Sequence, residues 1–123
     1  MEQIVSSLQN EYPSIGAVTV YDWQKNQIYF QSEAWDISED LGTILTAWQE
    51  SKPSIMVQGI KYSTLQCTPE RLVCRNLQGQ GAIVGANYNN QLIMIAWVSA
   101  DGDPGNAYRA VTKSMDEIRQ AGY

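Results

Sequence analysis

The sequence contains no histidine, which removes the side chain that most often serves as a general base or metal ligand. It has only 2 cysteines, too few for a zinc site. Positive charge is also scarce, since 8 basic residues stand against 13 acidic ones for a formal net charge of −5. General nucleic-acid and membrane-surface binders rely on a positive field, so this balance argues against both classes. We expect no enzyme, no bound metal, no cofactor and no nucleic-acid partner.

Long apolar runs and targeting features are missing as well. No stretch approaches the roughly 20 apolar residues of a membrane-spanning helix, and the N-terminal segment MEQIVSSLQNEY lacks the basic and apolar regions of a signal peptide. The simplest expectation is a cytoplasmic protein. With 123 residues, of which 44% are hydrophobic, the chain fits a single domain, residues 1–123, with one core.

The two cysteines, Cys67 and Cys74, flank a predicted turn at similar distances. If they lay opposite each other across a hairpin, a disulfide could join them. Otherwise they remain two reduced thiols, which is the usual state inside cells and is the state we expect.

Hydrophobic periodicity predicts three helices separated by strands. Residues 2–11 have the spacing of a short amphipathic helix, and residues 34–52 contain a second helix with Ser38 as its N-cap. A third helix begins after Asp103, a favourable N-cap, with Pro104 at its first position. Branched and aromatic residues predict strands within residues 15–22, 27–32, 54–67, 71–78, 81–88 and 91–99.

This order of elements predicts an α+β fold: a helix, two strands, a helix, four or five strands and a last helix. The later strands are separated by the short breaks TPE, GQG and NN, which are typical of an antiparallel meander. The simplest packing is one antiparallel sheet with helices on its faces.

The last helix is predicted to expose a basic face, where Arg109 and Lys113 lie one turn apart beside Tyr108. Lys61 and Arg75 lie in the strand region that precedes it. If those strands neighbour the helix, four of the 8 basic residues gather on one side of an acidic protein. Such a gathering is typical of a docking face for an acidic partner, whereas spacing alone favours a capped helix with a solvated face.

Several segments together resemble the profilin family. MVQGIKYSTLQ is similar to the family's hydrophobic-x-Gly-x-Lys-Tyr segment, and ERLVCRNLQGQGAIVGA resembles the hairpin that follows it. QLIMIAW, the DPG turn and the last helix resemble the closing elements, and SEDLGTILTAW stands where profilins have their middle helix. The likeness covers about residues 17–123 and implies a profilin-like fold. That fold is a central antiparallel sheet of about six to seven strands, with the N- and C-terminal helices on one face and the middle helix on the other.

The resemblance implies a monomeric, cytoplasmic, cytoskeleton-associated protein that binds actin monomers. It would regulate polymerisation by sequestering monomers and limiting nucleation. Actin-contacting positions of the family correspond here to Lys61, Ser63, Thr64, Gln66, Arg75, Gly102, Asp103, Gly105, Tyr108, Arg109, Thr112 and Lys113. Leu77 stands where many relatives have a lysine, which implies one salt contact fewer.

Two further family activities match these residues less well. Profilins bind proline-rich segments in an aromatic groove between the first and last helices. Tyr29 and Tyr123 match aromatic groove positions, but Ile4 is aliphatic where relatives have an aromatic ring, so we expect weak or absent polyproline binding. Phosphoinositides are a third candidate partner, although few basic residues are available for them.

One alternative belongs to another class of protein. Roadblock-type scaffold domains share a similar helix–sheet–helix plan, dimerise, and serve small GTPases. A stable homodimer would favour that alternative, whereas a monomer would favour a profilin.

Overall fold

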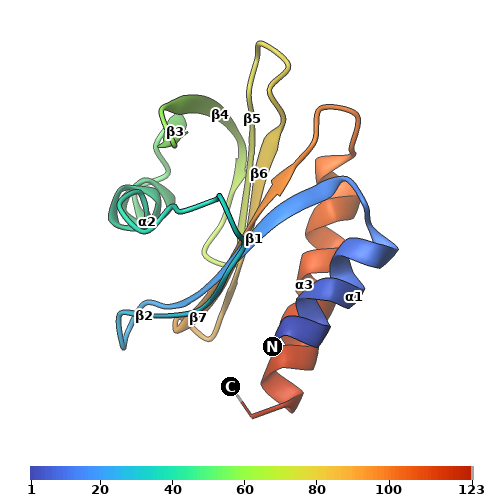
Figure 1. Cartoon of the computed structure of the whole chain (residues 1–123). Helices are drawn as coiled ribbons and strands as arrows, with labels where there is room; N and C mark the ends of the chain where they lie inside the picture. Colours follow the sequence, from blue (N-terminus) through green and yellow to red (C-terminus); the bar gives the residue numbers. More distant parts are fainter. Residues whose placement is uncertain (123) are drawn as a thin grey trace.

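The computed structural model describes residues 1–122, in which seven strands form one sheet accompanied by three helices (Figure 1). Their bounds are α1 (Glu2–Glu11), β1 (Ile15–Asp22), β2 (Gln27–Gln31), α2 (Leu41–Gln49), β3 (Ser54–Val57), β4 (Ile60–Cys67), β5 (Arg71–Arg75), β6 (Ala82–Tyr88), β7 (Leu92–Val98) and α3 (Pro104–Gln120). The strand order is β2-β1-β7-β6-β5-β4-β3, and every neighbouring pair is antiparallel. The predicted α+β class and antiparallel sheet are confirmed.

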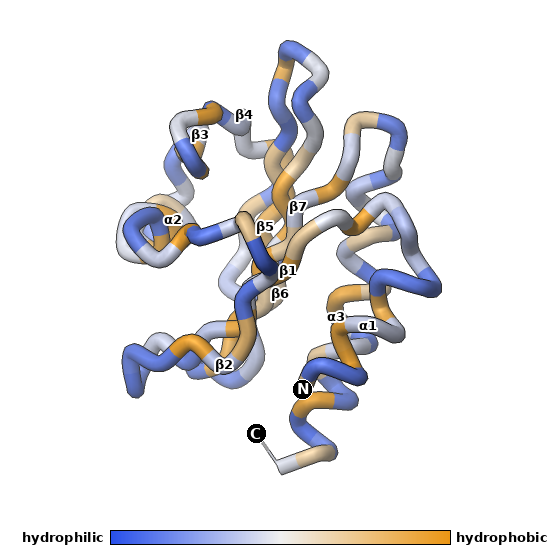
Figure 2. Tube along the Cα trace, viewed as in Figure 1, coloured by the Kyte–Doolittle hydropathy of each residue, from blue (hydrophilic) through white to orange (hydrophobic). Residues whose placement is uncertain are grey.

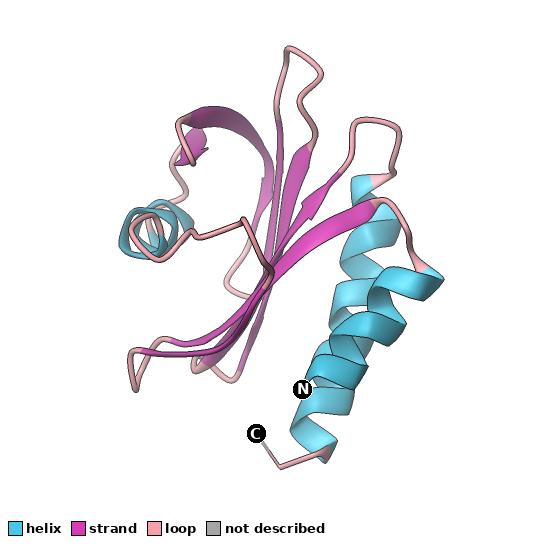
Figure 3. Ribbon diagram, in the orientation of Figure 1, coloured by secondary structure: helices cyan, strands magenta, loops and turns pink. Residues whose placement is uncertain are grey.

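The sheet separates two helical layers. α1 and α3 lie side by side on one face, and α2 lies on the other, where the sheet curls around it (Figures 1 and 3). Each face has its own apolar core, so the central strands are buried on both sides. In β7, for example, Met94 packs toward α1 and α3 while its neighbour Ile95 packs toward α2. Figure 2 shows the resulting contrast between apolar central strands and polar loop ends.

The helix α3 forms where local signals predict it. The carboxylate of Asp103 accepts a hydrogen bond from the Gly105 backbone N–H at 2.9 Å, and Pro104 opens the helix. Ala107, Val111 and Ile118 form a fully buried stripe against the sheet. The opposite side of α3 therefore faces outward, as the spacing predicts.

The predicted N-cap of α2 is wrong. The helix begins after Asp40, two residues later than predicted. Ser38 takes no part in capping, because its hydroxyl donates to the Asp36 carboxylate at 2.5 Å. Asp40 does not cap through its side chain either, since its carboxylate accepts from the Gln58 backbone N–H at 3.0 Å. The turn between β3 and β4 therefore takes the carboxylate that would otherwise cap α2.

The predicted region 54–67 folds as the hairpin of β3 and β4, which makes five strands after α2. The turn residues Gln58 and Gly59 have φ values of 51° and 78°, as a tight two-residue hairpin turn requires.

The two cysteines do not lie opposite each other. An irregularity between Thr64 and Gln66 shifts the register, so Cys67 pairs with Leu72 and Cys74 pairs with Thr64. Both cysteines are free thiols. Burial raises the pKa of the Cys74 thiol to about 11, which keeps it protonated and unreactive.

None of the three described helices is both long and apolar enough to cross a lipid bilayer.

Candidate protein-docking face

The face of the sheet that carries α1 and α3 is only partly covered by them. α3 packs mainly on β6, with fewer contacts to β7 and β5. Beyond it, β4 and β3 bend away around α2, and their outer side faces open solvent (Figure 1). The exposed side of α3 and the uncovered strands therefore form one continuous surface, which we call the docking face.

Strand register decides which predicted residues reach this face. Ser63 lies directly opposite Arg75, and Arg75 shares its side of β5 with Val73, which packs into the α1–α3 core. Lys61 lies two residues before Ser63 and therefore points to the same side. Lys61 and Arg75 are exposed and Ser63 is half-buried, so all three belong to the docking face.

Thr64 points the other way. It lies opposite Cys74, whose side chain belongs to the core under α2, and its hydroxyl donates to the Lys52 carbonyl at 2.9 Å. Gln66 returns to the docking face opposite Val73, because the irregularity between Thr64 and Gln66 inserts one residue into β4.

The outer side of α3 carries the second group of predicted residues. Gly105, Arg109, Thr112 and Lys113 are exposed there. Lys113 lies on the flank nearest α1, with its Nζ 3.5 Å from a carboxylate oxygen of Glu11. The four predicted cations therefore share one side of the sheet but form two pairs, one on the strands and one on the helix.

Tyr108 joins these two groups. Its hydroxyl donates to the Glu70 carbonyl at 3.3 Å, and the Arg71 guanidinium stacks over its ring at 4.3 Å from the centroid. Arg71 also donates to the Gln66 side chain at 3.0 Å. Sequence reasoning missed Arg71, although its alternation with Val73 and Arg75 along β5 is a signal that could have placed it on this face.

The remaining predicted residues, Gly102 and Asp103, have structural roles at the start of α3. A Cβ atom on Gly102 would lie 2.7 Å from side-chain atoms of Ser14 and Val98, so only glycine fits. Asp103 caps the helix, and its backbone carbonyl accepts from the Tyr12 hydroxyl at 3.1 Å.

A rigid loop between β5 and β6 holds one apolar side chain in solvent. Leu77 is 77% exposed, the highest value among the exposed large hydrophobic residues. The buried side chain of Asn76 fixes the loop, because it donates to the Lys61 carbonyl at 2.9 Å and accepts from the backbone N–H groups of Gln78 and Gln80. Leu77 lies between two shallow hollows of about 390 and 280 Å³, which extend toward Lys61 and toward Gly102 respectively.

The predicted proline-rich groove has an incomplete aromatic lining. Ile4 and Tyr29 are half-buried, and both pack against the α1–α3 core. The Tyr29 hydroxyl donates to the Asp22 carboxylate at 3.2 Å. Arg119 of α3 stacks over the ring of Tyr88, an aromatic residue that sequence reasoning did not include. Tyr123 lies outside the described residues.

Asp22 is a buried carboxylate at the end of β1. Burial raises its pKa, but four hydrogen bonds outweigh this effect and hold the pKa below its ordinary value of 3.8. The donors are the backbone N–H groups of Lys25 and Gln24 and the side chains of Gln91 and Tyr29. Asp22 therefore joins the β1–β2 turn to the turn between β6 and β7, which contains Gln91.

Within residues 1–122, no three His, Cys, Asp or Glu side chains gather as a metal site would require.

Comparison with known proteins agrees with this fold. The sequence model of the family described as Profilin matches residues 2–123. Odin profilin of Odinarchaeota yellowstonii (strain LCB_4) is 34% identical over 85% of each chain, and Thor profilin of Thorarchaeota archaeon (strain AB_25) is 29% identical over 95% of this chain and 90% of that one. A chain in the structure described as "LokiProfilin2/Rabbit Actin Complex" superposes with a TM-score of 0.87 at 25% identity, covering 95% of this chain and 93% of that chain.

Proposed function

The chain belongs to the profilin family, and on that premise we propose that it binds actin monomers and regulates their polymerisation. The observation that carries the proposal is that a similar profilin of the same fold was solved in complex with rabbit actin. A monomer held in such a complex is withheld from spontaneous nucleation, so the protein would lengthen the lag before filaments form. The roadblock-type scaffold is not favoured.

We assign actin binding to the docking face. Its charged and polar contacts would come from Lys61, Ser63, Gln66, Arg75, Gly105, Tyr108, Arg109, Thr112 and Lys113. Five of the 8 basic residues, the four predicted ones and Arg71, lie on this face of an acidic chain, and such a field steers an acidic partner toward it. Thr64, Gly102 and Asp103 would support the face from behind or at its edge.

Leu77 would supply an apolar anchor at this interface. Its exposure of 77% on a hydrogen-bonded loop means that burying it requires little reordering of the backbone. Full burial of a leucine contributes roughly 1.5–3 kcal/mol. An apolar contact therefore takes the place of the salt contact that a lysine would make there, and binding would depend less on ionic strength.

The proposal involves no catalytic step. It implies a cytoplasmic, cytoskeleton-associated protein, because actin monomers are found in the cytoplasm. Proline-rich peptides would bind weakly at most, since Ile4 is aliphatic and the Tyr29 hydroxyl is already bonded to Asp22. A phosphoinositide headgroup would have to bind the same few basic side chains of the docking face that would contact actin.

A polymerisation assay with purified actin from the same source tests the proposal. Adding the protein in increasing amounts should lengthen the nucleation lag in proportion, and the complex should contain one copy of each chain. An unchanged lag at a stoichiometric excess, together with a stable homodimer by mass measurement, would reject it in favour of a dimeric scaffold.

A further inference from the structure

Asn76, the residue that follows β5, is one of the few polar side chains buried in the described part of the chain. It lines the hollow of about 390 Å³ together with Lys61 of β4 and Leu77 of the following loop. Asn76 is only 7% exposed and so offers a partner almost no surface. Any effect that it has on binding must therefore come through its neighbours.

Both the backbone and the side chain of Asn76 hold this loop. Its backbone N–H donates to the Gly81 carbonyl at 2.9 Å, which closes the loop between β5 and β6. Its side-chain oxygen accepts from the backbone N–H groups of Gln78 and Gln80 at 2.9 and 3.0 Å. Its amide nitrogen donates to the Lys61 carbonyl at 2.9 Å. A carboxamide carries an acceptor and a donor on one small group, so a single side chain joins the loop to β4.

Trp97 of β7 holds the other end of the loop. Its indole N–H donates to the Gln80 carbonyl at 3.2 Å. Gly81 follows with a φ of 101°, and a Cβ atom there would lie 2.5 Å from the Val98 carbonyl oxygen, so the loop lies directly on β7. The loop is therefore attached to β4 near its start and to β7 near its end. Leu77 lies between these two attachments in the sequence.

Loss of the Asn76 amide would loosen the loop without opening the core. Gln78 and Gln80 are exposed, so water can bond their backbone N–H groups in the free protein. The loop would then sample many conformations, and binding a partner would have to order it again at a cost in conformational entropy. The exposed side chain of Leu77 would lose the benefit of being held in place before the partner arrives.

We propose that Asn76 is a positioning residue for actin binding and that it acts through Leu77. It holds the loop so that the apolar Leu77 and the cation of Lys61 meet the partner as one rigid surface. The matching partner surface places an apolar site beside a carboxylate. This inference rests on the proposed function and deepens it, because it assigns part of the affinity to a buried residue below the docking face.

Binding kinetics of Asn76→Ala with labelled actin monomers test the proposal. The dissociation constant should rise about fivefold, because a loop must now be ordered on binding. Faster dissociation should account for the change, since the charges that steer association remain. In the ¹⁵N-labelled protein, order parameters should show that the amides of Gln78 and Gln80 change from rigid to mobile.

Two results would overturn this role while leaving the proposed function in place. The unaltered protein binds actin but Asn76→Ala binds as tightly, or Asn76→Ala binds more weakly while its loop amides stay rigid. If the unaltered protein does not bind actin at all, the proposed function itself fails, and the role of Asn76 fails with it.

A double-mutant cycle shows whether Asn76 acts through Leu77. Added to Leu77→Ser, Asn76→Ala should weaken binding by less than about twofold further, because the side chain that it positions is already gone. An equal loss in both backgrounds would overturn the proposal. If Asn76→Ala does not fold, the same cycle is run with Asn76→Ser, whose hydroxyl can still accept from the Gln78 N–H as serine does in similar turns.

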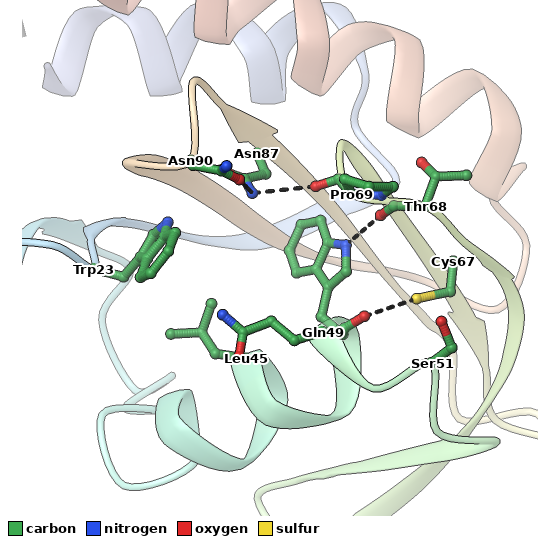
Figure 4. A pocket seen from close by; sticks show the side chains of 10 residues that line it. Trp23, Leu45, Gln49, Ser51, Cys67, Thr68, Pro69, Asn87 and Asn90 are labelled. Carbon is green, nitrogen blue, oxygen red and sulfur yellow. Dashed lines mark hydrogen bonds between the residues drawn. The ribbon is translucent and has the colours of Figure 1, made fainter.

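Leu45→Ala is the matched control for a loss of stability. Leu45 lines a cavity of about 270 Å³ with Trp23, Trp48 and Asn87, on the face of the sheet that carries α2 (Figure 4). Removing this partly buried side chain should lower the thermal midpoint and leave actin affinity unchanged, because the docking face lies on the other side of the sheet. A loss of affinity equal to that of Asn76→Ala would trace both effects to stability and would overturn the proposed role.

Discussion

The guanidinium of Arg71 lies 4.3 Å from the centroid of the Tyr108 ring, so that β5 and α3 are joined across the docking face. The stack positions Tyr108, whose hydroxyl is held by the Glu70 carbonyl, and it positions Gln66 through a hydrogen bond. These contacts preorganise two elements that are far apart in the sequence. They supply the first of four tests of the proposed interface and fold.

Arg71→Ala should weaken actin binding by about 1 kcal/mol, because it removes a cation–π stack and leaves Tyr108 less well positioned. Tyr108→Phe is the matched control, since it keeps the ring and loses only the hydroxyl bond to Glu70. Its effect should be smaller. Dissociation constants for labelled actin monomers measure both variants, and an Arg71→Ala protein that binds as tightly as the original would rule out this role.

Arg109→Glu should weaken actin binding by about 1–3 kcal/mol if the outer side of α3 meets an acidic surface. The loss should shrink as salt is added, because exposed charges are screened. Lys52→Glu makes the same charge reversal just after α2, away from the docking face, and should leave affinity nearly unchanged. Equal losses from both reversals would indicate net charge alone rather than a localised interface.

Leu77→Ser should weaken actin binding by about 1–2 kcal/mol with little change in its salt dependence, because an apolar contact is lost. Stability should hardly change, since the side chain is 77% exposed in the free protein. Ile28→Ser removes another exposed apolar side chain, on β2, and serves as the control. The anchor role fails if the two serine variants bind actin with the same affinity as the unaltered protein.

Asp22 should make stability depend on pH in the acid range. Its pKa is lower in the folded protein than the ordinary value of 3.8, so the unfolded chain takes up the proton first. The stabilisation is therefore complete above that value and is lost as the pH falls through the folded-state pKa. Asp22→Asn should cost about 1–3 kcal/mol at neutral pH, because an amide nitrogen then faces hydrogen-bond donors.

Urea unfolding at a series of pH values measures this effect. The Asp22→Asn variant should lose less stability on acidification than the unaltered protein. Parallel curves for the two proteins would mean that other carboxylates carry the acid dependence.

Local signals were sufficient where a segment depends on its own residues. The sequence predicts α1 and β1 at their observed bounds, because apolar spacing and branched residues specify them within a few positions. The same holds for α3, whose cap at Asp103 is built from adjacent residues. The cap of α2 was predicted wrongly, because the Ser38 hydroxyl donates to Asp36 and the Asp40 carboxylate accepts from Gln58 in a distant turn.

By itself, the amino-acid order determined the family, the succession of helices and strands, and the basic character of the last helix, since each depends on neighbouring positions. The tertiary structure decided that Thr64 turns inward while Gln66 does not, because one inserted residue in β4 reverses which side the chain presents. It also decided that Arg71 stacks on Tyr108 and that Trp23 and Asn87 line one cavity. Both arrangements bring together residues separated by long stretches of chain, so only the pairing and curling of the whole sheet could produce them.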